Sequence, residues 1–200
     1  FVDTDSTRVL RAYYGVRFYR VDAQGVCDSL QYLERDTTLT MYTKPVMWSG
    51  EQQIFGDTIR LFFNDSTIDR AHVINSTFAA QHKGEDFYDQ IEGNEIKAYF
   101  EGNEMRLIET SGNVITIFYP QESDSTITGM FNSDASFLNI FLEKNEMKKM
   151  VMWPSVKGKM YPLEQLNKET MFLSRYVWYG ERRPTDKDDI FRRPVNQSAV

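Results

Sequence analysis

Apolar and polar residues alternate in four short stretches of this chain, and a polar turn follows each stretch. In the stretch from 56 to 68, Ile59, Leu61 and Phe63 stand at every second position, and the polar residues 64–66 follow them. Successive side chains on a strand point to opposite faces, so these three share one face. Asn, Asp and Ser hydrogen-bond their own backbone in tight turns. The pattern therefore predicts a strand, a turn and the start of a returning strand.

The same hairpin pattern recurs in the stretches 28–39, 93–105 and 136–147. Equivalent positions in the four copies are 29, 37 and 42 residues apart: Asp28, Asp57, Asn94 and Ser136. A repeat with a period of ~20–50 residues indicates stacked supersecondary units. The irregular spacing favours antiparallel hairpins joined by loops of variable length over a strict solenoid. Gly112-Asn113 is expected to add a further chain reversal.

The pattern changes after Pro162. Five residues then follow at alternating steps of three and four, which is the spacing of one helix face: Leu163, Leu166, Thr170, Leu173 and Val177. Pro162 suits the start of a helix and Gly180 its end. Residues 181–200 are rich in charge and contain proline, which predicts a tail with little structure of its own. We expect a β domain over 1–162, a helical segment over 163–180 that caps one end of the sheet stack, and a charged tail over 181–200.

The composition favours an all-β fold class. The 200 residues are 41% hydrophobic and 14% aromatic, β-forming residues are plentiful, and turn residues recur at short intervals. The formal net charge of −6, without a basic face in the repeats, disfavours a nucleic-acid partner. No apolar run approaches the ~20 residues that span a bilayer. Because the chain begins at Phe1 rather than Met, we expect a processed form or a piece of a longer protein.

The sequence does not point to catalytic or metal chemistry. His72 and His82 lack the spacing of a zinc site. Cys27 is the single cysteine, which excludes an internal disulfide, and we expect a buried structural thiol because no base is tied to it. We therefore predict no enzyme activity, no catalytic residues, no metal and no cofactor. A carboxylate pair for glycoside hydrolysis stays open as an alternative, because separation in space is not visible in a sequence.

One face of the predicted hairpins carries a ladder of apolar residues. If the hairpins stack in register, this ladder fills a core or lines a groove for hydrocarbon, and an ordinary core explains most of its members. Its aromatic, alanine and methionine positions suit an adaptable apolar lining. The candidate groove residues are Leu30, Tyr32, Ile59, Leu61, Phe63, Ile96, Ala98, Phe100, Met105, Leu138, Ile140 and Leu142.

The repeats resemble the OstA/LptA family of lipopolysaccharide-transport proteins. The resemblance rests on the recurring pattern Gly-Asp/Asn-x-Ile-x-x-Phe/Tyr-Phe, on residues 112–119, and on residues 22–30, which are similar to runs in OstA-like proteins of the Bacteroidetes type. It covers roughly residues 8–162. It implies a folded-over antiparallel sheet, called a β-taco or β-jellyroll, and a periplasmic location, with association with the outer membrane as a further option. A helix after 162 departs from the minimal family pattern. At the C-terminal edge of the sheet, such a helix would block the joining of one domain to the next.

The resemblance also implies a function. The chain would be a non-enzymatic periplasmic carrier or bridge that shelters the lipid A acyl chains of lipopolysaccharide during transport to the outer membrane. Edge strands would join it to other β-jellyroll transport domains, and head-to-tail to copies of itself. Cations near the rim are candidates for meeting an anionic head group: Arg17, Arg20, Lys44 and Arg60.

Two alternatives belong to other classes. One is a structural β-repeat module, of the surface or adhesin type, with a fully packed core. A continuous apolar cavity between the sheets would argue against it. The other is a carbohydrate-active enzyme on a jelly-roll scaffold, which a pair of carboxylates ~5–10 Å apart in a cleft would favour.

Overall fold

The computed structural model describes residues 8–64, 67–102, 104–122, 126–144 and 146–192. The predicted lead-in at 1–7, parts of three predicted hairpin turns and the last eight residues of the predicted tail lie outside this part of the chain. The described chain is nearly all β, which confirms the predicted fold class. Within it, no helix combines the length and the apolar character needed to cross a membrane.

All four predicted hairpins are present. They are formed by β4 (Ser29–Leu33) with β5 (Thr38–Tyr42), β8 (Thr58–Asn64) with β9 (Thr67–Gly84), β10 (Phe87–Glu101) with β11 (Glu104–Phe118), and β12 (Met130–Glu143) with β13 (Glu146–Trp153). The remaining strands are β1 (Val9–Ala12), β2 (Val16–Tyr19), β3 (Gln24–Cys27), β6 (Val46–Ser49), β7 (Gln52–Phe55) and β14 (Lys157–Tyr161).

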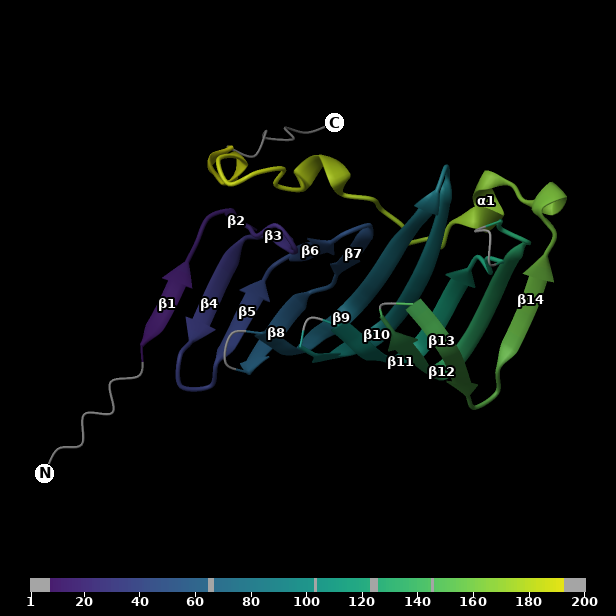
Figure 1. Cartoon of the computed structure of the whole chain (residues 1–200), viewed down its shortest axis with the longest axis horizontal. Helices are drawn as coiled ribbons and strands as arrows, with labels where there is room; N and C mark the ends of the chain where they lie inside the picture. Colours follow the sequence, from purple (N-terminus) through teal and green to yellow (C-terminus); the bar gives the residue numbers. More distant parts are fainter. Residues whose placement is uncertain (1–7, 65–66, 103, 123–125, 145, 193–200) are drawn as a thin grey trace, which may run out of the picture.

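These strands form one 14-stranded antiparallel sheet that is folded across its middle (Figure 1). The long strand β9 pairs with β8 through residues 67–74 and with β7 through residues 78–81. Likewise, β12 pairs with β14 through its first part and with β13 through its second. We call the two parts half-sheet A (β1, β4, β5, β8, β13 and the adjoining parts of β9–β12) and half-sheet B (β2, β3, β6, β7, β14 and the other parts of β9–β12). This arrangement is the folded-over sheet that the resemblance implies.

Left-handed backbone and glycine shape the crease between the half-sheets. In β9 the bend falls at Asn75 and Ser76, with φ of 57° and 50°. In β11 it falls at Gly112 and Asn113, with φ of 78° and 52°. Gly112-Asn113 is therefore a bend within one continuous strand, and the predicted chain reversal there is wrong. Asn and Gly adopt positive φ more easily than other residues, which explains their place at the crease.

Gly56, between β7 and β8, is expected to be intolerant of any side chain. A Cβ atom there would lie 2.6 Å from Cγ1 of Val73 and 3.0 Å from the carbonyl oxygen of Asn75. We predict that Gly56→Ala lowers the free energy of unfolding by about 1–3 kcal/mol, as overpacking usually does. Urea denaturation measures the loss. Gly50→Asn is the control, because Gly50 has φ +53° and no atom within 4 Å of its Cβ position. Equal stability of the two variants would contradict the crease argument.

The C-terminal segment forms short helical turns and not one continuous helix over 163–180. Its elements are η1 (Leu163–Gln165), α1 (Lys168–Met171), η2 (Gly180–Arg182) and η3 (Asp189–Phe191). We call residues 163–192 the strap, because they cross the outer face of half-sheet B from β12 to β2 (Figure 1). The strap covers a face of the sheet and does not cap the end of the stack.

Two buried glutamines hold the strap in an extended conformation. Gln90 donates to the carbonyl oxygen of Met171 at 2.8 Å and accepts from the backbone N–H of Leu173 at 2.9 Å. Gln53 donates to the carbonyl oxygen of Val177 at 2.8 Å and accepts from the N–H of Tyr179 at 2.7 Å. Each side-chain amide thus satisfies strap backbone groups that a helix would have satisfied internally.

Further contacts extend to the end of the described chain. Arg183 donates to Oε1 of Gln24 at 2.8 Å, and Arg17 lies 3.5 Å from a carboxylate oxygen of Asp189. Residues 181–192 of the predicted tail are therefore held against the sheet. Tyr179 packs edge-on to Phe55, with ring centroids 5.4 Å apart. The strap and half-sheet B consequently enclose an apolar core of their own, separate from the core between the half-sheets.

Candidate functional site

A cavity of about 1010 Å³ lies between the two half-sheets. Strand alternation places every second side chain on the inner face, and both half-sheets contribute their inner faces to its walls. Eight of the predicted groove residues line it: Ile59, Leu61, Ile96, Ala98, Phe100, Met105, Ile140 and Leu142.

The other four predicted residues do not line the cavity. Leu30 and Leu138 are buried in the core clusters between the half-sheets. Phe63 packs against the cluster that contains Leu30. Tyr32 is half-buried on β4. For Leu30 and Leu138 the ordinary core explanation holds.

Half-sheet B supplies a wall that the hairpin repeats did not reveal. It is made of Met47, Ile54, Ala79 and Ile91, which line the cavity opposite half-sheet A. Met47 pairs with Ile54, Ile54 with Ala79, and Ala79 with Ile91, so the four form one row across β6, β7, β9 and β10. Ile91 alone has polar residues on both sides, whereas Met47 lies between Val46 and Trp48 and Ala79 between Phe78 and Ala80, so the row shows no clear alternation. The segments are too short to stand out from the loops around them.

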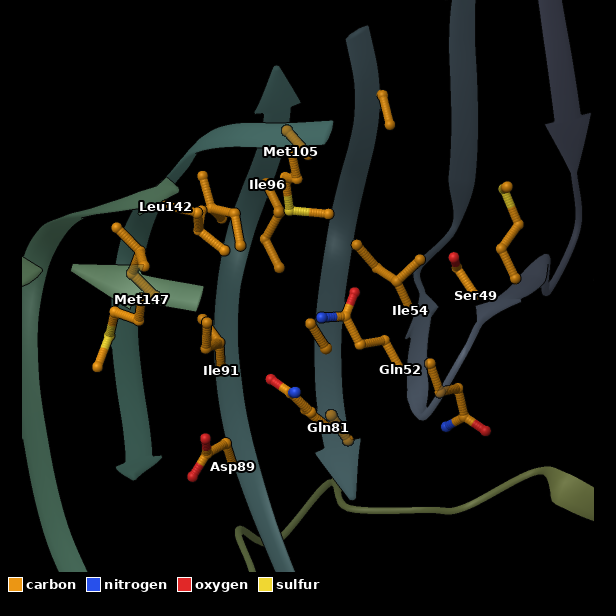
Figure 2. Close-up of a pocket in the computed structure, with 18 of the residues that line it drawn as sticks. Ser49, Gln52, Ile54, Gln81, Asp89, Ile91, Ile96, Met105, Leu142 and Met147 are labelled. Carbon is orange, nitrogen blue, oxygen red and sulfur yellow. The ribbon is translucent and has the colours of Figure 1, made fainter. Parts of the chain in front are cut away.

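Next to that apolar row, half-sheet B carries a polar row at its outer end. Ser49 pairs with Gln52, Gln52 with Gln81, and Gln81 with Asp89. All four residues line the cavity, and Figure 2 shows them together at one side of it. We call this row the polar lip.

The opposite lip, at the hairpin ends of half-sheet A, is mainly apolar, and Thr67 and Glu146 are its polar members. Phe100 pairs with Met105 and Leu142 pairs with Met147, and all four line the cavity together with Ile68. We call these five residues the apolar lip. Met105, Leu142 and Met147 lie on the side of the cavity away from the polar lip (Figure 2). The trough between the half-sheets is therefore amphipathic from lip to lip.

Asp89 is the carboxyl group of the site whose pKa is raised by its surroundings. Its Oδ1 accepts a hydrogen bond from the N–H of Tyr119 at 2.8 Å, and Nζ of Lys83 lies 3.8 Å from Oδ2. Burial raises the pKa of Asp89 to about 6, and the Tyr119 N–H and Lys83 offset this only in part. At neutral pH the polar lip thus carries a partly buried carboxylate.

The predicted head-group cations do not form a site. Arg17 binds Asp189 of the strap, Lys44 is exposed, and Arg60 lies on the face opposite to Ile59. None of Arg17, Lys44 and Arg60 lines the cavity. Arg20 does line it, but its guanidinium is held by both carboxylate oxygens of Asp22, at 3.0 and 2.9 Å.

The cysteine and the histidines have structural surroundings. Cys27 is buried, as predicted, and burial raises the pKa of its thiol to about 12. Nε2 of His72 lies 2.5 Å from a carboxylate oxygen of Glu95. Nδ1 of His82 lies 3.4 Å from a carboxylate oxygen of Glu51. Among the described residues, no group of three or more His, Cys, Asp or Glu side chains is placed to hold a metal.

No protein-family model matches the chain. No curated protein matches it either. Among solved structures, the chain is similar to LptH from Pseudomonas aeruginosa, described as the LptA homologous periplasmic component of the lipopolysaccharide transport device. The sequence identity is 10%, the match covers 66% of this chain and 95% of that chain, and the TM-score is 0.48. Similarity at this level concerns the course of the backbone and says nothing about a ligand or partner of this chain.

Proposed function

We propose that this chain is a non-enzymatic periplasmic carrier or bridge that shelters lipopolysaccharide acyl chains during transport to the outer membrane. The observation that carries the proposal is the cavity of about 1010 Å³ between the half-sheets. Protein interiors are normally packed with few voids larger than a water molecule. A trough of this size, with apolar residues on both walls, therefore argues for an apolar occupant.

The energetics of hydrocarbon in water support the same role. Each methylene group taken out of water gains about 0.8 kcal/mol, so a multi-acyl lipid does not cross an aqueous compartment unescorted. Ligand pockets of ~300–1,000 Å³ bury most of a drug-sized molecule. The trough accordingly has room for hydrocarbon of the size of a drug-like molecule or larger, and in this proposal the head group stays near the lips.

The end strands are the proposed docking sites for other β-jellyroll domains or for head-to-tail copies. Among the described residues, β1 and β2 at one end, and β13 and β14 at the other, pair on one side only. The strap runs over the outer face and pairs with neither β13 nor β14. Unpaired N–H and C=O groups of such edges accept an added strand.

The cavity favours the carrier over the alternative of a structural module with a packed core. For the carbohydrate-active alternative, two of the cavity carboxylates, Asp22 and Asp89, are already engaged by Arg20 and Lys83. An acid–base pair for glycoside hydrolysis needs one carboxylate to give a proton and the other to act as base or nucleophile.

Site-specific photo-crosslinking tests the carrier. Crosslinkers at Phe100 and Leu142, which line the trough, should label lipopolysaccharide strongly. Matched crosslinkers at Arg60 and Lys97, on the outer face of half-sheet A, should label it weakly. Mass spectrometry of lipid extracted from the purified protein is the companion measurement. Equal labelling of inner and outer positions would overturn the proposal.

A further inference from the structure

The difference between the two lips has a consequence for the ligand, and this consequence rests on the proposed function. An amphiphile in the trough has one polar end and one hydrocarbon end. Facing the apolar lip, with Phe100, Met105 and Leu142, a polar head group would lose hydration without gaining hydrogen bonds. Facing the polar lip, it meets Ser49, Gln52, Gln81 and Asp89. The polar end of the ligand therefore belongs at half-sheet B.

Three side chains of the polar lip are free to bind a head group. Within the described part of the chain, those of Ser49, Gln52 and Gln81 form no hydrogen bond. Ser offers a hydroxyl, and Gln offers two N–H donors and a carbonyl acceptor. Neighbouring strands stand ~4.8 Å apart, so these groups form a closely spaced row. Such a row suits a ligand with several hydroxyl or N–H groups.

The charges around the cavity decide which head groups are excluded. Among the described lining residues, the only cations are Arg20 and Lys83, and each is paired with a carboxylate, Asp22 or Asp89. Glu122 adds a further carboxylate to the lining, whereas Glu146 lies at the opposite lip, next to Met147, and is paired with Lys148 at 2.9 Å. Phosphate recognition normally uses unpaired Arg or Lys side chains or clustered N–H donors. A phosphate at this lip would meet the amide N–H donors of Gln52 and Gln81, but it would also face carboxylates and find no unpaired cation to balance its charge.

We propose that the polar lip selects the head group by charge: it binds a hydroxyl- or ammonium-bearing head group and excludes phosphate. A lipopolysaccharide-type glycolipid would then contact the lip through its sugar hydroxyls and keep its phosphates in solvent. Sugar hydroxyls and ammonium share the property of donating hydrogen bonds to amide and carboxylate oxygens. Separate probes distinguish these two sources.

Three amphiphiles with the same dodecyl chain test the proposal: dodecyl maltoside, dodecylamine and dodecyl phosphate. Their affinities for the full chain are measured below their critical micelle concentrations, by displacement of a fluorescent fatty acid. We expect the maltoside or the amine, or both, to bind at least about tenfold more tightly than the phosphate, because like charges at a binding site are strongly unfavourable. The tighter of the two identifies hydroxyl or ammonium as the preferred group.

Variants of the lip separate selection from simple hydrophobic binding. Asp89→Asn should lower the affinity for dodecylamine several-fold and reduce the difference in affinity between dodecylamine and dodecyl phosphate. Gln81→Leu should weaken the maltoside. Asp134→Asn is the matched control, because it removes the same charge from an exposed residue that does not line the cavity. It should change none of the three affinities.

Dodecyl phosphate that binds as tightly as the other two would overturn the head-group proposal and leave the carrier proposal standing. The head-group proposal would also be overturned if neither Asp89→Asn nor Gln81→Leu changed the affinity for any of the three amphiphiles. Absence of binding by all three amphiphiles, with no lipid in the purified protein, would overturn both proposals.

Discussion

Replacing Gln53 by leucine is expected to lower the free energy of unfolding by about 3–6 kcal/mol, since each buried polar group left unpaired costs ~1–3 kcal/mol. Gln53 is 1% exposed and binds three groups. It donates to the carbonyl oxygen of Val177, and its Oε1 accepts from the N–H of Tyr179 and from Nε1 of Trp48 at 3.0 Å. Leucine has a similar size and pairs with none of them. Urea denaturation gives the stability, and hydrogen exchange at Tyr179 reports release of the strap.

Gln165→Leu is the matched control for this substitution. Gln165 is exposed in η1, and its side chain forms no hydrogen bond within the described residues. Its replacement should change stability by no more than about 0.5 kcal/mol, as surface changes generally do. Similar losses for the two variants would mean that the Gln53 amide does not anchor the strap.

The strap gives half-sheet B a core that is independent of the trough. Trp48 and Val46 are buried on the outer face, where Phe55 and Tyr179 pack against them. Burial of this apolar surface by the strap stabilises the sheet whatever occupies the space between the half-sheets. The inner faces can therefore stay partly unfilled, which a carrier requires and a single-core domain would not tolerate. The stability of half-sheet B therefore does not depend on packing between the half-sheets alone.

The hairpins were predictable because the signals that define them are local. Alternation with period two and polar turns within a few residues specify each strand pair. The crease was not predictable in the same way. Its Gly-Asn and Gly-Asp pairs have turn chemistry, yet at Gly112-Asn113 both halves of β11 keep their partners β10 and β12. Only the register across three strands distinguishes a bend from a reversal.

The strap was mispredicted because its contacts are far apart in sequence. Leu166 and Leu173 have helix spacing, but both pack on the cluster that contains Tyr119. The hydrogen bonds that keep this segment extended join residues 81 to 126 positions apart. A local pattern carries no trace of such partners, and tertiary contacts override helix propensity.

The trough was predicted in part for a similar reason. The apolar wall of half-sheet A lies on the hairpins, so its lining residues repeat with them. The polar lip looks like an ordinary solvent-facing set of Ser, Gln and Asp residues in the sequence. Its meaning depends on the pairing of Gln52 with Gln81 and of Gln81 with Asp89, which only the register of three strands reveals.

Asp89 is expected to cost the fold stability at neutral pH, so Asp89→Asn should stabilise the protein. The asparagine Oδ1 can still accept the hydrogen bond from the N–H of Tyr119. The pKa of Asp89 is about 6 in the fold against an ordinary value of 3.8, and this difference corresponds to about 3 kcal/mol. This pKa already includes the favourable pairing with Lys83, so the expected gain at pH 7 is about 3 kcal/mol.

The pH dependence gives this prediction a sign that a packing effect would not have. Because the pKa of Asp89 is higher in the folded than in the unfolded chain, the folded state binds the extra proton between about pH 4 and pH 6. Below about pH 4 the unsubstituted chain and Asp89→Asn should have equal free energies of unfolding. As the pH rises from about 4 to 6, the unsubstituted chain should lose stability relative to Asp89→Asn, and above pH 6 the difference should level off. Urea denaturation of both proteins across this range measures the difference. A difference that is constant with pH would show that the carboxylate is not strained by burial, and a destabilised variant would show that its charge supports the fold. We expect instead that the Asp89 carboxylate destabilises the fold and is nevertheless present at the lip of the trough. Ionisable groups with shifted pKa values are often found at binding sites.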